Sequence, residues 1–223
     1  DNSGHNPIGQ IDSVTAVGPG KIRVCGWTMD EDALWTPLTV HVYVGGGPGD
    51  PNAEGHIITA DQLREDVGQA YPFAGNYHGF DTVISTGKSG WTVVNVFGMN
   101  QGNGDNTLLT NSGWIVDVPK DTEAPTISEV EITNVTSTGY TVTCTVLDNV
   151  GISKVVMPTW TEAGGQDDII WGDATTFIVK ASYNVSFSSH NFEYGHYNTH
   201  IYAYDLAGNY TSYPVIVDVP AVL

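Results

Sequence analysis

The sequence predicts an all-β protein with two tandem antiparallel β-sandwich domains of the immunoglobulin-like kind. Short runs rich in Val, Ile, Thr, Tyr and Trp recur along the chain, and apolar and polar residues alternate within them. That alternation is typical of strands with one buried face. Clusters of Gly, Pro, Asn and Asp separate the runs, and helical periodicity is nearly absent. A chain of 223 residues is long enough to build one hydrophobic core or two.

The first half contains seven runs that we expect to form strands. Seven short strands in about 110 residues are typical of a β-sandwich. The one candidate helix is a turn or two at residues 60–67. The expected strands are residues 11–17, 21–28, 38–44, 56–59, 78–85, 91–99 and 114–118.

The second half repeats the pattern and predicts a second sandwich of about 100 residues. Segments that contain Gly, Asn and Asp, such as residues 148–151 and 205–209, mark its turns. The expected strands are residues 127–135, 140–147, 152–160, 168–171, 176–179, 184–187, 197–204 and 213–219.

A polar segment between Pro119 and Pro125 lacks the alternation of its neighbours. Proline at each end of so short a segment favours a stiff connection over a flexible tether. The sequence therefore predicts domains at residues 1–119 and 120–223, joined by a short linker.

Acidic residues dominate both halves of the chain. The sequence has 7 Lys and Arg against 25 Asp and Glu, and each half has a net charge of −9. A negative surface repels phosphate backbones and anionic lipids, so we expect no nucleic-acid partner. We expect no membrane insertion either, because no apolar run approaches the length that spans a bilayer. The composition is typical of a secreted or cell-surface protein, and residues 1–7 resemble a linker within a larger protein.

Two cysteines, Cys25 and Cys144, lie in different halves, each within an alternating strand pattern. Thiols in separate cores cannot reach disulfide geometry. Both are therefore expected to be free, as small apolar core residues.

The stretch at residues 157–171 combines two tryptophans with an amide and two acids. Exposed aromatic rings can stack on sugar faces while Asp and Gln bind hydroxyl groups, and such sites are mostly aromatic with a few polar groups. The alternative is structural, with the tryptophans in the core and the polar residues holding a tight hairpin. The candidate ligand-binding residues are Trp160, Gln166, Asp167, Asp168, Trp171, Tyr197 and His200.

Catalysis by this stretch is not expected. Adjacent acids at Asp167 and Asp168 point to opposite faces of a strand, whereas glycosidase carboxylates face each other about 5–10 Å apart. His196 and His200 have the spacing of a helical zinc pair, but on a strand they lie roughly 13 Å apart. One zinc ion cannot bind both at that separation.

Calcium is the better metal candidate, and no other cofactor is expected. Asp121, Asp148 and Asp205 could gather oxygens at one end of the second domain, and calcium binds six to eight such ligands. The alternative is that these acids terminate strands and accept hydrogen bonds from their own turns.

Histidines and tryptophans of the first half could together line a pocket, although single histidines in strands are usually structural. They are His41, His56, His78, Trp27, Trp35 and Trp91.

The motifs Gly26-Trp27 and His78-Gly79-Phe80-Asp81, with the Gly- and Asn-rich segment 100–106, lie in the first half. Through them residues 7–118 resemble a β-module of large surface and cell-wall-associated proteins of Gram-positive bacteria. No firm activity is attached to that module, so this resemblance implies context only.

The segments 158–162, 165–171 and 197–205, together with His190, carry a second resemblance. Through them residues 125–219 resemble the repeat domain family named after the Bsp protein of group B streptococcus. Members occur as non-catalytic repeats beside cell-wall hydrolases and in surface proteins. The resemblance implies an accessory role at the wall or on a glycan.

Together these observations predict a non-catalytic pair of accessory modules in a secreted or surface bacterial protein. The expected partner is a cell-wall polymer or another glycan, next to a catalytic or adhesive domain of the same chain. The alternative is a structural spacer or stalk, or adhesin domains that bind a host protein without binding glycan.

Overall fold

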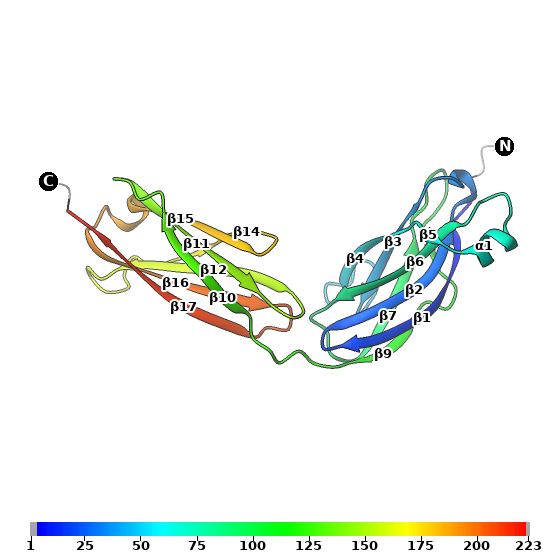
Figure 1. Cartoon of the computed structure of the whole chain (residues 1–223), viewed down its shortest axis with the longest axis horizontal. Helices are drawn as coiled ribbons and strands as arrows, with labels where there is room; N and C mark the ends of the chain where they lie inside the picture. Colours follow the sequence, from blue (N-terminus) through cyan, green and yellow to red (C-terminus); the bar gives the residue numbers. More distant parts are fainter. Residues whose placement is uncertain (1–3, 222–223) are drawn as a thin grey trace. The chain divides into compact units, whose positions relative to one another are not determined.

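The computed structural model describes residues 4–221, and it confirms the all-β fold with two sandwiches (Figure 1). The chain divides into two compact units, Asp1–Asp121 and Thr122–Leu223. The sequence-based boundary after residue 119 lies in the same connecting segment. Among residues 4–221, no helix is long and apolar enough to cross a membrane.

The first unit consists of two antiparallel sheets (Figure 1). One sheet has the strand order β1-β2-β6-β5, and the other has the order β4-β3-β7-β8, with β9 also paired to β7. The strands are β1 (Ile8–Gly18), β2 (Lys21–Met29), β3 (Leu38–Val44), β4 (Glu54–Ala60), β5 (Gln62–Leu63), β6 (Tyr77–Ser85), β7 (Gly90–Gly98), β8 (Thr107–Leu108) and β9 (Trp114–Val118).

Side chains from both sheets form the core of the first unit. In β3, buried Val40, Val42 and Val44 alternate with half-exposed His41 and Tyr43, as expected for a strand with one face in the core. Such alternation fixes the register of the sheet, because a slip of one residue would expose the valines.

The second unit also has two antiparallel sheets, with strand orders β10-β11-β15-β14 and β13-β12-β16-β17. A short 3-10 helix, η2 (Phe187–His190), follows β15. The strands are β10 (Thr126–Thr133), β11 (Gly139–Leu147), β12 (Ile152–Thr161), β13 (Ile170–Asp173), β14 (Thr175–Phe177), β15 (Lys180–Ser186), β16 (Gly195–Asp205) and β17 (Tyr210–Val219).

The two units have the strand order of an immunoglobulin sandwich. Lettered in chain order, one sheet of each unit has the order A-B-E-D, and the other has the order C′-C-F-G, with β8 and β9 of the first unit both paired to strand F at the G position. This order matches the immunoglobulin arrangement. In the second unit, β13-β12-β16-β17 is the C′-C-F-G sheet.

Two local predictions were wrong. The helix expected at residues 60–67 begins later, as α1 (Glu65–Ala70), because residues 62–63 pair with β6 as strand β5. Cys25 is not a core residue: its neighbour Val24 is buried, so Cys25 faces outward and its thiol donates to Asp81.

The other cysteine prediction was right. Cys144 is buried, and burial raises the pKa of its thiol to about 11. Both cysteines are free thiols.

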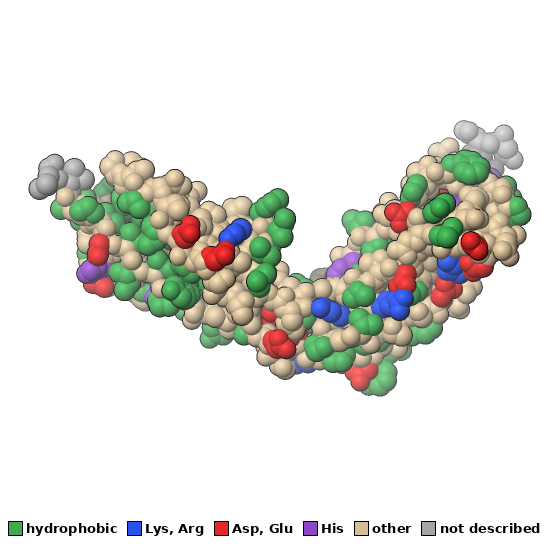
Figure 2. Space-filling model, viewed as in Figure 1, with side chains coloured by type: hydrophobic (Ala, Val, Ile, Leu, Met, Phe, Trp, Pro, Cys, Tyr) green, Lys and Arg blue, Asp and Glu red, His purple; other side chains and the backbone are tan. Residues whose placement is uncertain are grey.

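Charged side chains are sparse on the visible surface, and hydrophobic side chains gather in patches over each unit (Figure 2). Monomeric soluble proteins rarely expose large contiguous apolar patches without a binding role. In the second unit, exposed Trp171 and Tyr210 lie on strands of the same sheet.

Candidate functional site

Outward-facing rings cover the sheet β13-β12-β16-β17. Along β16, the buried residues Tyr197, Thr199, Ile201 and Ala203 alternate with half-exposed residues on the outer face. Neighbouring strands add further rings on the same face at matching register positions. We call this set the aromatic face, and it consists of Trp160, Trp171, His200, Tyr202, Tyr204 and Tyr210.

Ring contacts join one half of the aromatic face across three strands. The ring centroids of Trp160 and His200 lie 4.8 Å apart, and those of His200 and Tyr202 lie 6.5 Å apart. Trp171, on β13, lies 5.8 Å from Tyr202. The Trp171 side chain is 59% exposed, so most of its ring is available to a ligand.

The other half of the aromatic face continues toward β17. The centroids of Tyr202 and Tyr210 lie 6.0 Å apart, and those of Tyr210 and Tyr204 lie 5.5 Å apart. The Lys154 ammonium lies 5.0 Å from the centre of the Tyr204 ring, within the range of a cation–π interaction. The six rings therefore form one continuous surface over four strands.

Three predicted ligand-binding residues, Trp160, Trp171 and His200, belong to the aromatic face. The structural alternative placed both tryptophans in the core, and the structure instead places them on the outer face of the sheet. Gln166 and Asp167 are exposed in the turn between β12 and β13. Consecutive glycines at positions 164 and 165 with positive φ shape this turn.

The prediction that Tyr197 binds a ligand was wrong, because its side chain is fully buried. Its ring contacts Tyr140 and Phe187 at 6.0 and 5.1 Å, and its hydroxyl donates to the Glu193 carbonyl at 3.0 Å. Burial raises the pKa of the Tyr197 phenol to about 12, and the Asp168 and Glu193 carboxylates add to the shift. Tyr197 stabilises the core and cannot stack on a ligand.

The prediction that Asp168 binds a ligand was also wrong, because its side chain is only 3% exposed. One of its carboxylate oxygens accepts from the Thr161 backbone N–H at 3.1 Å. The other lies 2.8 Å from His190 Nδ1 and 3.3 Å from the Thr161 hydroxyl. Asp168 therefore ties the end of the β12–β13 hairpin to η2, and none of these contacts leaves it facing a ligand.

The three acids proposed for calcium lie together. One ligand oxygen from each of Asp121, Asp148 and Asp205 lies within 4.8 Å of the others, although these residues are far apart in sequence. Oxygens that share one Ca²⁺ at about 2.3–2.6 Å lie no more than about 5 Å apart. The spacing of the three carboxylates fits a calcium ion.

Hydrogen bonds within the turns orient two of these acids. Asp205 accepts from the backbone and side-chain amides of Asn209 at 2.8 and 2.7 Å. Asp148 Oδ1 accepts from the backbone of Val150 and Gly151, while its buried Oδ2 accepts no hydrogen bond from the residues that the structure describes. The turn contacts expected under the alternative are therefore present, and they leave one buried carboxylate oxygen for a cation.

The histidines and tryptophans of the first unit do not share one pocket. Trp35 and His78 line one cavity, whereas His41 and His56 line another on the β3–β4 surface. Trp27 contacts the Tyr71 ring at 5.6 Å.

Sequence comparison covers part of the second unit. Residues 129–214 match the family model of the GBS Bsp-like repeat. The match supports the resemblance predicted for the second half. The matched residues include all six members of the aromatic face, on β12, β13, β16 and β17. The resemblance of the first half to a surface-protein module stays a prediction. No curated protein matches the chain in sequence.

Several solved structures are similar to the chain at low sequence identity. A tetra-tandem repeat from the extending region of a large adhesion protein has a TM-score of 0.41 and 17% identity, over 97% of this chain and 49% of that one. The chain thus spans about half the length of that structure. The FN1–FN3 domains of chicken CNTN1 have a TM-score of 0.36 and 12% identity, over 97% of this chain and 68% of theirs.

A third such structure is that of a 1.5-MDa bacterial ice-binding adhesin. It has a TM-score of 0.30 and 12% identity, over 98% of this chain and 65% of that one. All three scores are below 0.5, so no functional argument follows from them.

Sequence reasoning did not assign Tyr202, Tyr204 and Tyr210 to the site. The signal for two of them was present, because aromatic residues at positions 200, 202 and 204 alternate with smaller residues. Alternation predicts that they share a face. Which rings of the neighbouring strands lie beside them depends on the register of the sheet, which the sequence pattern does not give.

Proposed function

We propose that the second unit binds a neutral glycan through the aromatic face, as a non-catalytic module of a secreted or surface protein. The observation that carries this proposal is the continuous surface of partly exposed rings on one sheet. Aromatic rings offer a flat apolar surface with polar edges, which matches the alternating C–H and hydroxyl surfaces of a sugar. The rings stand on a hydrogen-bonded sheet, so little ordering is needed on binding.

The charge of the chain favours a neutral polymer over an anionic one. The half that contains the aromatic face has a net charge of −9, and its one lysine near the rings, Lys154, already lies over Tyr204. A negative field repels polyanions such as teichoic acids or acidic polysaccharides. Neutral chains with apolar ring faces avoid that repulsion.

The extent of the aromatic face favours a polymer over a free sugar. Neighbouring strands lie about 4.8 Å apart, so a surface across four strands extends about 14 Å. That width offers several stacking positions, and a ligand with repeated rings would use more than one of them. Each further sugar ring that stacks on the aromatic face raises the affinity of the whole polymer chain.

A structural spacer or a protein-binding adhesin is the second candidate. Two immunoglobulin-like units joined through a segment that carries Pro119 and Pro125 would suit a stalk. The rings would then serve a protein partner, because aromatic residues are also enriched at protein interfaces.

The test measures binding of the full chain to insoluble cellulose, chitin and purified peptidoglycan. We expect the wild-type protein to sediment with at least one of these polymers, and Trp171→Ala to bind about tenfold more weakly, about 1.4 kcal/mol. Tyr202→Ala should have a similar effect, because its ring contacts three other members of the aromatic face.

Phe177→Ala is the matched control. Phe177 is 75% exposed but lies on β14 in the other sheet of the same unit, so its loss should leave binding unchanged. If no polymer retains the wild-type protein, or if Phe177→Ala weakens binding as much as Trp171→Ala, the glycan proposal fails. The spacer or protein-binding candidate then gains support.

A further inference from the structure

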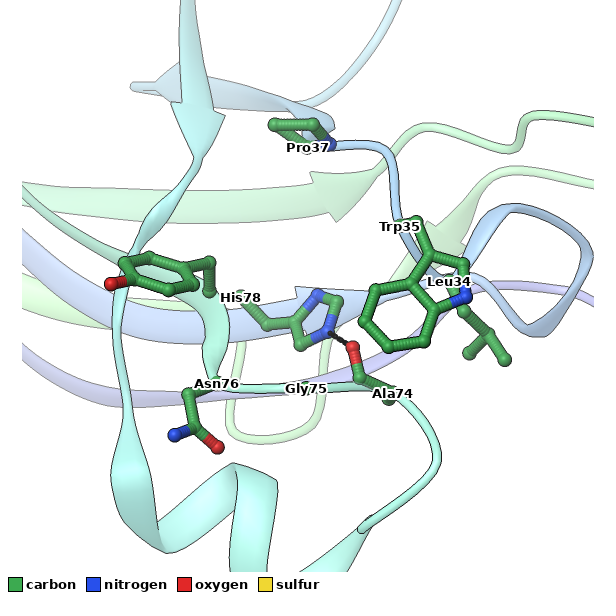
Figure 3. A pocket seen from close by; sticks show the side chains of 8 residues that line it. Leu34, Trp35, Pro37, Ala74, Gly75, Asn76 and His78 are labelled. Carbon is green, nitrogen blue, oxygen red and sulfur yellow. Dashed lines mark hydrogen bonds between the residues drawn. The ribbon is translucent and has the colours of Figure 1, made fainter.

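A small cavity opens beside Trp35 in the first unit, whereas the aromatic face belongs to the second unit (Figure 3). Its volume is about 120 Å³, close to the roughly 150 Å³ of an engineered protein cavity that holds benzene. It therefore has room for about one six-membered ring. The residues that line it are Leu34, Trp35, Pro37, Ala74, Gly75, Asn76, Tyr77 and His78.

His78, one of the residues that line the cavity, has a buried hydrogen-bond acceptor. His78 is 3% exposed, and its Nε2 lies 2.8 Å from the Ala74 carbonyl oxygen (Figure 3). A carbonyl oxygen can only accept, so Nε2 carries the proton in the neutral ring, and Nδ1 is left with a lone pair. Nδ1 is buried and has no hydrogen-bond partner among the described residues. Buried polar atoms in folded proteins nearly always have a partner, so this nitrogen indicates a missing donor.

Trp35 supplies a flat wall beside that acceptor. Its side chain is 82% exposed, so much of the ring surface is open to solvent. Gly75 has a φ of +82°, and a Cβ at this position would lie 3.4 Å from the Trp35 ring. The indole thus lies against bare backbone, and one of its faces is open.

We propose that this cavity binds one neutral glycosyl residue, with the sugar ring against Trp35 and a hydroxyl group that donates to His78 Nδ1. A hydroxyl is both small enough for the cavity and able to donate. The apolar side chains Leu34 and Ala74 would face the C–H surface of the sugar. No lysine or arginine lines the cavity, so an anionic group would have no counter-charge there.

Access to Nδ1 requires a small movement of the cavity wall, because the atom is covered in the unbound protein. Trp35 and Tyr77 are 82% and 62% exposed, so rotation of either ring gives up little buried contact. The environment of the Trp35 indole should therefore change on binding, which makes its N–H a direct reporter.

The experiment titrates the full chain with glucose, galactose, N-acetylglucosamine, cellobiose and chitobiose. Binding is followed through the tryptophan indole signals in ¹H–¹⁵N NMR spectra, and Trp35 is assigned by its loss in Trp35→Ala. We expect at least one sugar to shift the Trp35 signal saturably in the millimolar range. Trp35→Ala should bind that sugar about tenfold more weakly, read from backbone amides of residues 74–78.

His78→Gln tests the acceptor. The glutamine amide nitrogen can take the place of Nε2 and keep the bond to Ala74, while the Nδ1 lone pair is lost. Binding should weaken about fivefold with the same melting temperature, and His78→Gln with wild-type affinity would contradict the assigned role of Nδ1. A second variant, Tyr77→Ala, should keep the indole shift, because Tyr77 is 62% exposed and the proposal gives it no contact with the sugar.

Trp91→Ala is the matched control, since Trp91 is 78% exposed on β7 but does not line the cavity. The proposal is overturned if no sugar up to about 50 mM shifts the Trp35 signal, a limit that corresponds to only about −1.8 kcal/mol of binding. It is also overturned if Trp91→Ala and Trp35→Ala weaken binding equally.

Discussion

The two units share one strand order but present different outer faces on the same sheet. In the second unit, the C′-C-F-G sheet carries six linked rings. In the first unit, the outer face of that sheet has a shorter cluster: the rings of His41 and Tyr43 lie 6.2 Å apart, and those of Tyr43 and Phe97 lie 5.8 Å apart. Gly55, paired with Tyr43 on the next strand, adds no side chain. A hollow of about 200 Å³ lies there instead of a further ring.

This difference shows that the same fold can carry different surfaces, depending on the residues at its outward-facing positions. The fold supplies an outer face whose positions alternate with core positions. The residues at those outer positions then decide between a flat row of rings and a hollow. The cavity proposed to bind a single sugar ring is a separate feature, because it is lined by Trp35 and His78 and not by the residues of this hollow.

The largest expected effect is the difference in stability loss between a buried and an outward-facing ring on β16. Tyr197→Ala should destabilise the second unit by about 4 kcal/mol, because a fully buried ring is lost from the core. Tyr202→Ala should lower stability by less than about 1 kcal/mol, because its ring is partly exposed on the outer face of the sheet. Urea unfolding followed by circular dichroism measures both. Equal losses would contradict the assignment of Tyr202 to a surface that is independent of the core.

Calcium should change the stability of the protein by an intermediate amount. One carboxylate oxygen from each of Asp121, Asp148 and Asp205 lies within 4.8 Å of the others. Calcium at about one hundred times its dissociation constant should stabilise the protein by about 2.7 kcal/mol. Calorimetry with Ca²⁺ and with EDTA measures the shift in melting temperature.

Asp148→Asn should abolish the calcium effect, because it removes a charge at the buried oxygen. Asp173→Asn is the control, since Asp173 is exposed on β13 outside the cluster. Identical melting temperatures with Ca²⁺ and with EDTA in the wild-type protein would leave the turn contacts as the whole role of these acids.

The smallest expected effect concerns acid sensitivity of the first unit. The Arg23 guanidinium that hydrogen-bonds to Asp81 lowers the pKa of that carboxyl to about 2, below its ordinary value of about 3.9. The pair therefore contributes stability above about pH 4, and the contribution is lost as the pH falls through about 2. Because the pair is exposed to solvent, the contribution is small.

Asp81→Asn should therefore lower the melting temperature of the first unit by about 2 °C at pH 7 and leave it unchanged near pH 2. Thermal scans at both values measure this. A difference that persists at pH 2 would show that Asp81 acts through its bond to Cys25 and not through its charge.

Much of the fold could be predicted from the sequence because β-strands encode their faces in alternation. The strands at positions 38–44 and 114–118 begin and end where the sequence placed them. The short strands β5 and β8 were missed, since two residues are too few to show a period. The pairing of Gln62 and Leu63 with β6 is a tertiary contact that local pattern does not encode.

The candidate site was predictable only in part. Trp160, Trp171 and His200 were found through residue type, but Tyr197 and Asp168 were also chosen on that ground and proved to be buried. Position in the alternation decides exposure, and Tyr197 differs from His200 by an odd number of residues along β16. Tyr210 joins the site through pairing with Tyr204, which requires knowledge of the register.

The alternation along β16 also determines which kinds of sequence change the second unit can tolerate. Replacing the residue at position 200, 202 or 204 changes the aromatic face and leaves the core positions untouched. Insertion of a single residue within the strand would have the opposite consequence, because every side chain beyond it would move to the other face. Tyrosines would then enter the core while Ile201 and Ala203 faced water. Families built on this unit should therefore diversify their surfaces by substitution, with changes in length confined to the turns.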